Sequence, residues 1–164
     1  MFALAILIGI YSYLIFALGL INLLYKSYII WTTVVYLLSC IFWYRRSLIT
    51  FFLNFMGLPR RSFHSLLAMT SGRVFLGLII VQVLINLIGA LGPELGFDAL
   101  WYHLTLPKLY LENHSVTYIH GGLLYYSLMP KFTEMLYVGA QAINGEILAK
   151  LIHFSFGILS CIAL

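Results

Sequence analysis

Long apolar runs without a charged residue are the feature that most constrains the fold of this chain. Such runs extend over about Phe2–Leu24, Tyr28–Tyr44 and Val74–Leu91. A helix rises about 1.5 Å per residue, so roughly 20 apolar residues cross a hydrocarbon core about 30 Å thick. Each run is therefore predicted to form a membrane-spanning helix.

The composition also indicates an integral membrane protein. Of the 164 residues, 63% are hydrophobic and 9% are charged, whereas about one quarter of a soluble domain is charged. The net charge is +4, but the basic residues flank apolar runs, as they do at membrane boundaries, so no nucleic-acid partner is expected. Cys40 and Cys161 lie inside apolar runs and are interpreted as apolar side chains, not as a disulfide or zinc site.

The end of the chain predicts two more spans. One is expected from about Leu123 or Pro130 to Ile143, and another from Ile147 to Leu164, with Asn144-Gly145 as a tight cytoplasmic turn between them. Because the last run is still apolar at Leu164, we expect the N-terminal part of a longer polypeptide. The predicted fold is all-α and polytopic, with residues 1–164 as a single transmembrane domain of about five spans.

Loop charges predict the orientation in the membrane. The loop between the first two spans contains Lys26, whereas the region from the end of the second span to the start of the third contains Arg45, Arg46, Arg60, Arg61 and Arg73. Cytoplasmic loops are rich in Lys and Arg. The Arg-rich region, in which the short apolar run 48–55 is expected to lie along the interface, is therefore assigned to the cytoplasm. Residues 92–131 then form an extracytoplasmic loop of a multi-pass protein in the plasma membrane or a bacterial inner membrane.

This loop begins with the stretch GPELGFDALWYHLTLPKLYLE, which holds three of the five acids of the chain, namely Glu94, Asp98 and Glu112. Within residues 97–110, Leu100, Trp101 and Leu104 share one face at helical spacing, and Tyr102 neighbours Asp98 on another. The pattern predicts a juxtamembrane helix on the membrane surface, which Pro107 kinks or divides in two.

Asp98 is the first candidate for chemistry. A carboxylate at this boundary, partly buried beside Trp101, could act as a general base towards an acceptor hydroxyl. An Asp before an apolar helix is also a common N-cap residue. Glu94 could share a site with Asp98 or be a solvated loop acid.

Four further residues are candidates for binding a substrate. His103 could shuttle a proton or, with Lys108, hold a phosphate, although a solvated histidine and a snorkelling lysine fit equally well. Tyr102 lies beside them. Glu134, in the predicted fourth span, is costly in lipid and is expected to face a polar cavity or to pair with Lys131. The external acids could coordinate a divalent cation, but no ligand spacing predicts a metal site.

From Phe97 onwards the sequence is similar to a known family. The segments FDALWYHLTLPKLYLENHSVTYI and MPKFTEMLYVGAQAINGEILAKLIHFSFGIL resemble the first extracytoplasmic loop and the next two helices of C-fold (GT-C) glycosyltransferases. The branch with protein O-mannosyltransferases and the aminoarabinose transferase of lipid A is the more similar one. The resemblance covers roughly residues 92–164. It implies a polyprenyl-phosphate sugar donor and a catalytic role for Asp98, and it matches Pro130–Glu134 and Lys150, where many members have Arg.

The sequence leaves three functions open. The first is a glycosyltransferase that moves a sugar from a polyprenyl-phosphate donor to an unidentified acceptor outside the cytoplasm. Its catalytic residue would be Asp98, and its substrate-binding residues would be Tyr102, His103, Lys108 and Glu134. The second is a transporter or proton-coupled subunit in which Asp98 and Glu134 relay protons. The third is a non-catalytic assembly fragment, in which neither acid matters.

Overall fold

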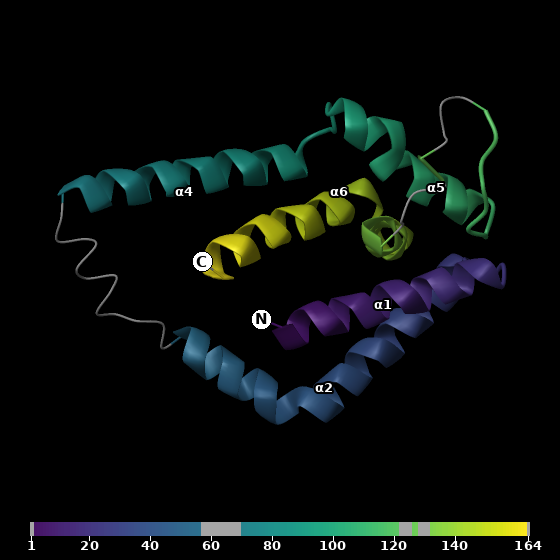
Figure 1. Cartoon of the computed structure of the whole chain (residues 1–164), viewed down its shortest axis with the longest axis horizontal. Helices are drawn as coiled ribbons and strands as arrows, with labels where there is room; N and C mark the ends of the chain where they lie inside the picture. Colours follow the sequence, from purple (N-terminus) through teal and green to yellow (C-terminus); the bar gives the residue numbers. More distant parts are fainter. Residues whose placement is uncertain (1, 57–69, 122–125, 128–131, 164) are drawn as a thin grey trace. The chain divides into compact units, whose positions relative to one another are not determined.

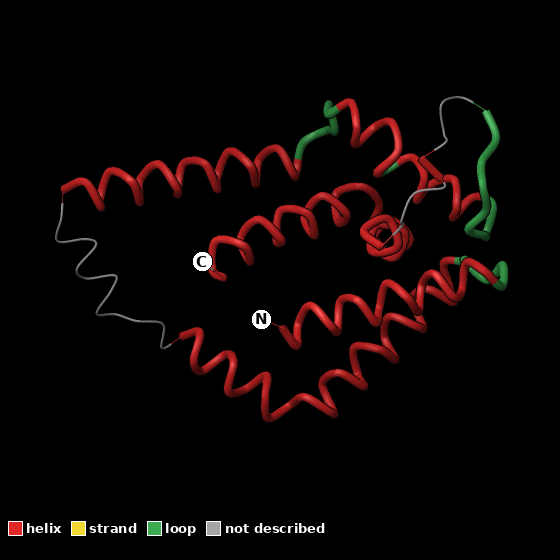
Figure 2. Tube along the Cα trace, in the orientation of Figure 1, coloured by secondary structure: helices red, strands yellow, loops and turns green. Residues whose placement is uncertain are grey.

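The computed structural model describes residues 2–56, 70–121, 126–127 and 132–163 (Figure 1). Within these ranges all regular secondary structure is helical (Figure 2). The prediction of an all-α chain is confirmed. The elements are α1 (Phe2–Leu20), α2 (Lys26–Met56), α4 (Thr70–Leu91), the π-helix η1 (Ala99–His103), α5 (Thr105–Glu112) and α6 (Phe132–Ala163).

Four of these helices are long and apolar enough to cross a membrane, through the windows Ala3–Leu20, Lys26–Trp43, Gly72–Leu91 and Phe132–Cys161. The first three agree with the predicted spans and support the class of membrane protein. The helix α2 continues beyond the predicted end of the second span at Tyr44 and includes the run 48–55 as far as Met56. Arg60, Arg61 and Lys131 lie outside the described residues.

The chain divides into two compact units. One consists of Met1–Tyr36 and Gly89–Leu164, and the other of Leu37–Ile88. The first unit contains every residue that the sequence marks as a candidate for function. The second contains the rest of α2 and most of α4.

Polar side chains join α1 to the first part of α2, which lie side by side in Figure 1. The Tyr36 hydroxyl donates to the carbonyl of Leu7 at 2.6 Å. The hydroxyls of Tyr11 and Thr33 are 2.9 Å apart. Between the helices Asn22 adopts a left-handed conformation (φ 59°), which a short polar side chain tolerates and which helps the chain reverse. Hydrogen bonds of this kind help to hold apolar helices together inside a membrane.

The helix α6 is broken at Asn144-Gly145. Asn144 has φ −143° and ψ 29°, and Gly145 has φ 69° and ψ −159°, so neither residue is helical. Figure 1 shows the segment before the break end-on and the segment after it from the side. The break agrees with the turn that the sequence predicts. The segment from Phe132 to Ile143 is only roughly 18 Å long at about 1.5 Å per residue, which is shorter than the hydrocarbon core.

The segment 132–143 remains close to the loop that follows α4 along its whole length. Near its start, Glu134 contacts His103, and near its end the Gln141 side-chain amide donates to the carbonyl of Leu104 at 2.9 Å. Beyond the break, the Lys150 ammonium donates to the carbonyl of Gly92. The five predicted spans are therefore not confirmed. Residues on both sides of the Asn144-Gly145 turn contact the loop after α4. If the segment 132–143 crossed the membrane, this turn would lie far from that loop.

The segment 132–143 is buried around most of its surface, between α1 and α5. Its Met135 and Val138 share a core with Ile15 of α1 and Tyr110 of α5. Gly139 lies so close to Tyr11 that a Cβ atom there would overlap the Tyr11 ring. Tight packing against α1 therefore fixes where this segment lies.

The turn after α1 and the segment after α5 are also joined. The Leu24 amide donates to the carbonyl of His114, and the Val116 amide donates to the carbonyl of Gly19, both at 3.1 Å. The imidazole of His114 stacks on Tyr25 with ring centroids 3.9 Å apart. Loops after the first and third spans should emerge on the same side of a membrane, and these contacts agree with that expectation.

Replacing Gly139 with alanine should destabilise the first unit by about 1–3 kcal/mol, because the added methyl group displaces Tyr11. The measurement is the free energy of unfolding in detergent. The matched control is Gly157→Ala, also in α6, where nothing lies within 4 Å of the new Cβ. Equal stability changes in the two variants would contradict the close packing of α6 on α1.

Candidate functional site

The loop between α4 and η1 is fixed by Glu94. Its carboxylate accepts hydrogen bonds from the backbone amides of Leu95 at 3.1 Å and Gly96 at 2.8 Å. This acid therefore orders the turn that leads to Asp98. Both hydrogen bonds are exposed, so a partly solvated Glu94 remains compatible with this role.

The first turns of the juxtamembrane segment form a π-helix, not the predicted α-helix. The Leu104 amide donates to the carbonyl of Ala99 at 2.9 Å, five residues earlier. In a π-helix, residues four and five positions apart both lie about one turn away. Tyr102 and His103 therefore both lie about one turn after Asp98. Pro107 lies in the first turn of α5, where a missing N–H costs little, so it helps to start a second helix.

The carboxylate of Asp98 is exposed and available. Asp98 occupies the N-cap position of η1, but its side chain makes no capping hydrogen bond. The predicted burial beside Trp101 is not observed, because the residue is exposed. With the residues that the structure describes, the carboxylate forms no hydrogen bond or ion pair. The N-cap interpretation is therefore not supported, and this carboxylate is accessible to a ligand.

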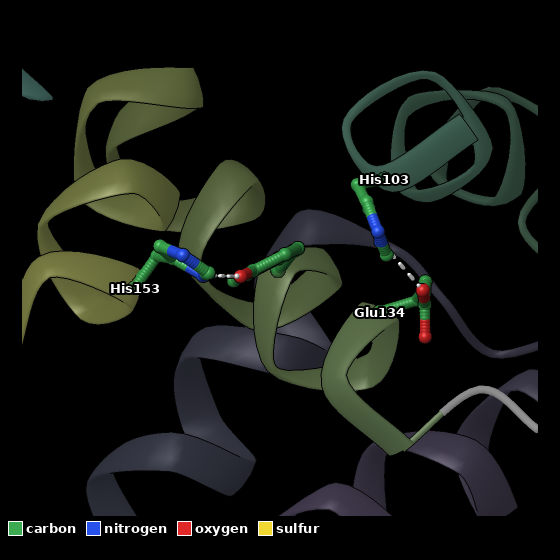
Figure 3. A network of polar contacts seen from close by, with 4 residues as sticks. His103, Glu134 and His153 are labelled. Carbon is green, nitrogen blue, oxygen red and sulfur yellow. Dashed lines mark hydrogen bonds and ion pairs between the residues drawn. The ribbon is translucent and has the colours of Figure 1, made fainter. Parts of the chain in front are cut away.

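Glu134 holds the imidazole of His103. Figure 3 shows the two side chains pointing towards each other, with His103 Nδ1 2.9 Å from Glu134 Oε1. The Glu134 side chain is only 10% exposed, whereas that of His103 is 37% exposed. A carboxylate on one ring nitrogen sets the orientation of the imidazole and leaves the other nitrogen for a ligand. Glu134 is thus almost fully buried and paired with His103, whereas Lys131, the partner that the sequence suggested, lies outside the described residues.

Aromatic rings line the segment from Phe97 to His103. Phe97 packs edge-on against Trp101 with centroids 4.7 Å apart, and Trp101 packs edge-on against Tyr126 at 5.3 Å. Tyr126 in turn stacks on Tyr102 at 4.4 Å. We call Phe97, Trp101, Tyr102 and Tyr126 the aromatic cluster. The ring centroid of Tyr102 also lies 4.0 Å from that of His103. The aromatic cluster therefore extends from Phe97, which precedes Asp98, to the His103–Glu134 pair.

The structure does not bring Lys108 to the other candidates. Lys108 is exposed on α5, whose buried residues are Leu106, Pro107 and Tyr110. Among the described residues its ammonium group forms no hydrogen bond or ion pair. His103 thus contacts two other candidates, Glu134 and Tyr102. Asp98 lies about one turn before them on the same segment, and no contact joins Lys108 to any of them.

Two side-chain contacts could not have been predicted from neighbouring residues in the sequence, namely those made by Tyr126 and His153. Tyr126 lies 24 positions after Tyr102, and only the density of aromatic residues in the loop hinted at its role. His153 accepts or donates a hydrogen bond with the Tyr137 hydroxyl at 2.9 Å, across the break in α6 (Figure 3). This second pair joins the two segments of α6. Within the described ranges no three His, Cys, Asp or Glu side chains are grouped as a metal site would require.

The charge of Glu134 also affects Tyr110 on α5. Burial, and then the nearby negative charge of Glu134, raise the pKa of Tyr110 from 10.0 to about 12. Both causes disfavour a phenolate, which would be a second negative charge in a dry environment. The Tyr110 side chain therefore remains neutral beside the His103–Glu134 pair.

Together these groups could support proton transfer beside a bound ligand. The site offers an exposed carboxylate, an imidazole oriented by a buried carboxylate, and aromatic faces between them. All are carried by the segment directly after α4 and by the start of α6. No family model, curated protein or solved structure matches the chain.

The raised pKa of Tyr110 predicts a loss of stability in alkali. The folded state holds the phenol proton more tightly than the unfolded chain, so the contribution is complete below pH 10 and is lost as the pH rises towards about 12. The measurement is the free energy of unfolding as a function of pH. Tyr110→Phe should remove this component, while Tyr118→Phe, at an exposed tyrosine, should retain it. Identical alkaline profiles for the wild type and Tyr110→Phe would contradict the burial of this phenol beside Glu134.

Proposed function

We propose that this chain is, or belongs to, an inverting membrane glycosyltransferase that uses a polyprenyl-phosphate-linked sugar. The observation that carries the proposal is the exposed, unengaged carboxylate of Asp98, about one helical turn before an imidazole that Glu134 holds. The resemblance of residues 97–164 to C-fold glycosyltransferases gives the same carboxylate the catalytic role. The acceptor would meet the donor on the extracytoplasmic side.

We further propose that the membrane is crossed four times, by α1, α2, α4 and the segment 146–163. The segment 132–143 would then lie along the outer boundary with η1 and α5. Three observations support this arrangement. The segment is too short to cross, both of its ends contact residues 103–104, and Lys150 beyond the break contacts Gly92.

In the proposed reaction, an acceptor hydroxyl attacks the anomeric carbon of the donor. A bond forms between the hydroxyl oxygen and this carbon while the bond from the carbon to the phosphate oxygen breaks. The hydroxyl proton passes to Asp98, and the electron pair leaves with the polyprenyl phosphate. Attack opposite the leaving group inverts the anomeric configuration. A positioned carboxylate can contribute about 10²–10⁴-fold to such a step.

His103 would stabilise the leaving phosphate. In its doubly protonated form it donates one N–H to Glu134 and presents the other to a phosphate oxygen, which is a charge-assisted hydrogen bond. Glu134 acts as a positioning residue, since its carboxylate orients the imidazole. Lys108, exposed on the same juxtamembrane segment, would add positive charge near the headgroup.

The donor lipid would reach the site from the bilayer. Leu95 and Phe97 follow the end of α4 within a few residues and are 85% and 70% exposed. Apolar and aromatic side chains in this position favour the interface between headgroups and acyl chains. Asp98, the next residue, would then lie where an isoprenoid phosphate meets water. Tyr102 of the aromatic cluster would offer contacts to the sugar.

Asp98→Asn in the full-length protein should lower the rate of sugar transfer by about 10²–10⁴-fold, because the amide cannot accept the hydroxyl proton. The measurement is transfer from a defined polyprenyl-phosphate sugar in membranes. The matched control is Glu112→Gln, which removes another exposed acid of the same loop and should leave the rate unchanged. Unchanged transfer in Asp98→Asn would contradict the proposed role.

The pairing of His103 with the buried Glu134 also favours a second candidate, a proton-coupled membrane protein, because acids within membrane proteins can serve as proton relays with histidine. Proton flux into liposomes separates the two functions. Flux that is lost in Glu134→Gln and does not need a lipid-linked sugar would support the relay and contradict the transferase.

A further inference from the structure

The middle of α4 contains two amide side chains in an otherwise apolar span. Gln82 is the eleventh residue of the 20-residue window Gly72–Leu91, and Asn86 follows one turn later. The Gln82 side-chain amide donates to Asn86 Oδ1 at 2.9 Å, and both side chains are exposed. Hydrocarbon offers no hydrogen bonds, so amides at this depth are stabilised by partners on another helix.

The hydrogen bond between them leaves a complementary set of groups. Gln82 retains its carbonyl oxygen as an acceptor, and Asn86 retains its NH₂ group as a donor, neither with a recorded partner among the described residues. If the oxygen and nitrogen of both amides were exchanged, Asn86 would donate to Gln82 instead. One acceptor would then remain on Asn86 and one donor on Gln82. A second α4, related by a two-fold axis parallel to the helix, presents the matching groups. Gln82 can accept from the partner subunit's Asn86 while Asn86 donates to the partner subunit's Gln82.

We propose that the protein forms a parallel dimer in the membrane, with α4 packed against α4 of a second copy through Gln82 and Asn86. The reciprocal pairing is the pattern of an isologous interface, in which residue i meets residue j and residue j meets residue i. Four amide groups then have hydrogen-bond partners and none faces lipid. The proposal does not depend on the enzymatic function, because it uses only the two amides and their depth in the span.

Disulfide cross-linking of the full chain in native membranes tests the dimer. The background carries Cys40→Ala and Cys161→Ala, because both native thiols are free. Ile79→Cys places a thiol on the Gln82 face, one turn earlier, and Leu84→Cys places one on the opposite face; both native side chains are exposed. Oxidation should give a covalent dimer with Ile79→Cys and not with Leu84→Cys.

Adding Gln82→Leu and Asn86→Leu to the Ile79→Cys chain should weaken association about tenfold, which corresponds to the loss of one or two membrane hydrogen bonds. Leucine favours membrane insertion, so the loss would not reflect failure to insert. Exchanging the amides, as Gln82→Asn with Asn86→Gln, should retain the dimer. The proposal would be overturned if both faces cross-linked equally, if Ile79→Cys did not cross-link, or if it cross-linked to another protein. A dimer that the leucine substitutions did not weaken would also overturn it.

Discussion

The contact between Glu134 and His103 joins the start of α6 to the juxtamembrane segment, and the arrangement of the other candidate groups depends on it. A charged carboxylate that is almost fully buried needs a partner, and the imidazole provides one. The same contact holds the segment 132–143 beneath η1, where Gln141 reaches Leu104 at the other end. One polar pair thus helps to determine both the geometry of the site and the course of the chain.

The bilayer imposes the second constraint. Hydrocarbon provides no hydrogen bonds, so a helix must either cross the core completely or lie at its edge. The segment 132–143 is too short for the first and carries polar side chains that contact the loop at both of its ends, which fits the second. Placing this segment at the edge concentrates Asp98, His103 and Glu134 at one boundary. That boundary is where a lipid-linked substrate would present its phosphate.

Much of the fold follows from the sequence because apolar length is a local property. The first three spans, the turn at Asn144-Gly145 and the second helix at Pro107 were all predicted from residues within each stretch. The prediction of five spans is not confirmed, because apolarity alone cannot distinguish a short enclosed helix from a spanning one. Burial of Met135 and Val138 by α1 and α5 is a tertiary effect. The continuation of α2 through Arg45-Arg46 likewise shows that a charged pair need not end a helix.

The sequence named the candidate residues but not their geometry. Asp98, His103 and Glu134 were each recognisable as polar groups in an apolar context. The π-helical register of η1, in which both Tyr102 and His103 lie about one turn after Asp98, was indicated by no sequence pattern. The pairing of His103 with Glu134 bridges 31 positions and requires the packing of α6. Glu94 was separated from the site by its hydrogen bonds to the loop backbone.

The most direct test is the sidedness of residue 146, just beyond the break in α6. In a chain with its native cysteines replaced, Glu112→Cys and Glu146→Cys, both at exposed positions, would be exposed separately to a membrane-impermeant maleimide on intact cells. Four crossings with the site outside the cytoplasm predict labelling of both positions without permeabilisation. Labelling of Glu146→Cys only after permeabilisation would show that the segment 132–143 crosses the membrane, and would contradict the placement of the site along its length.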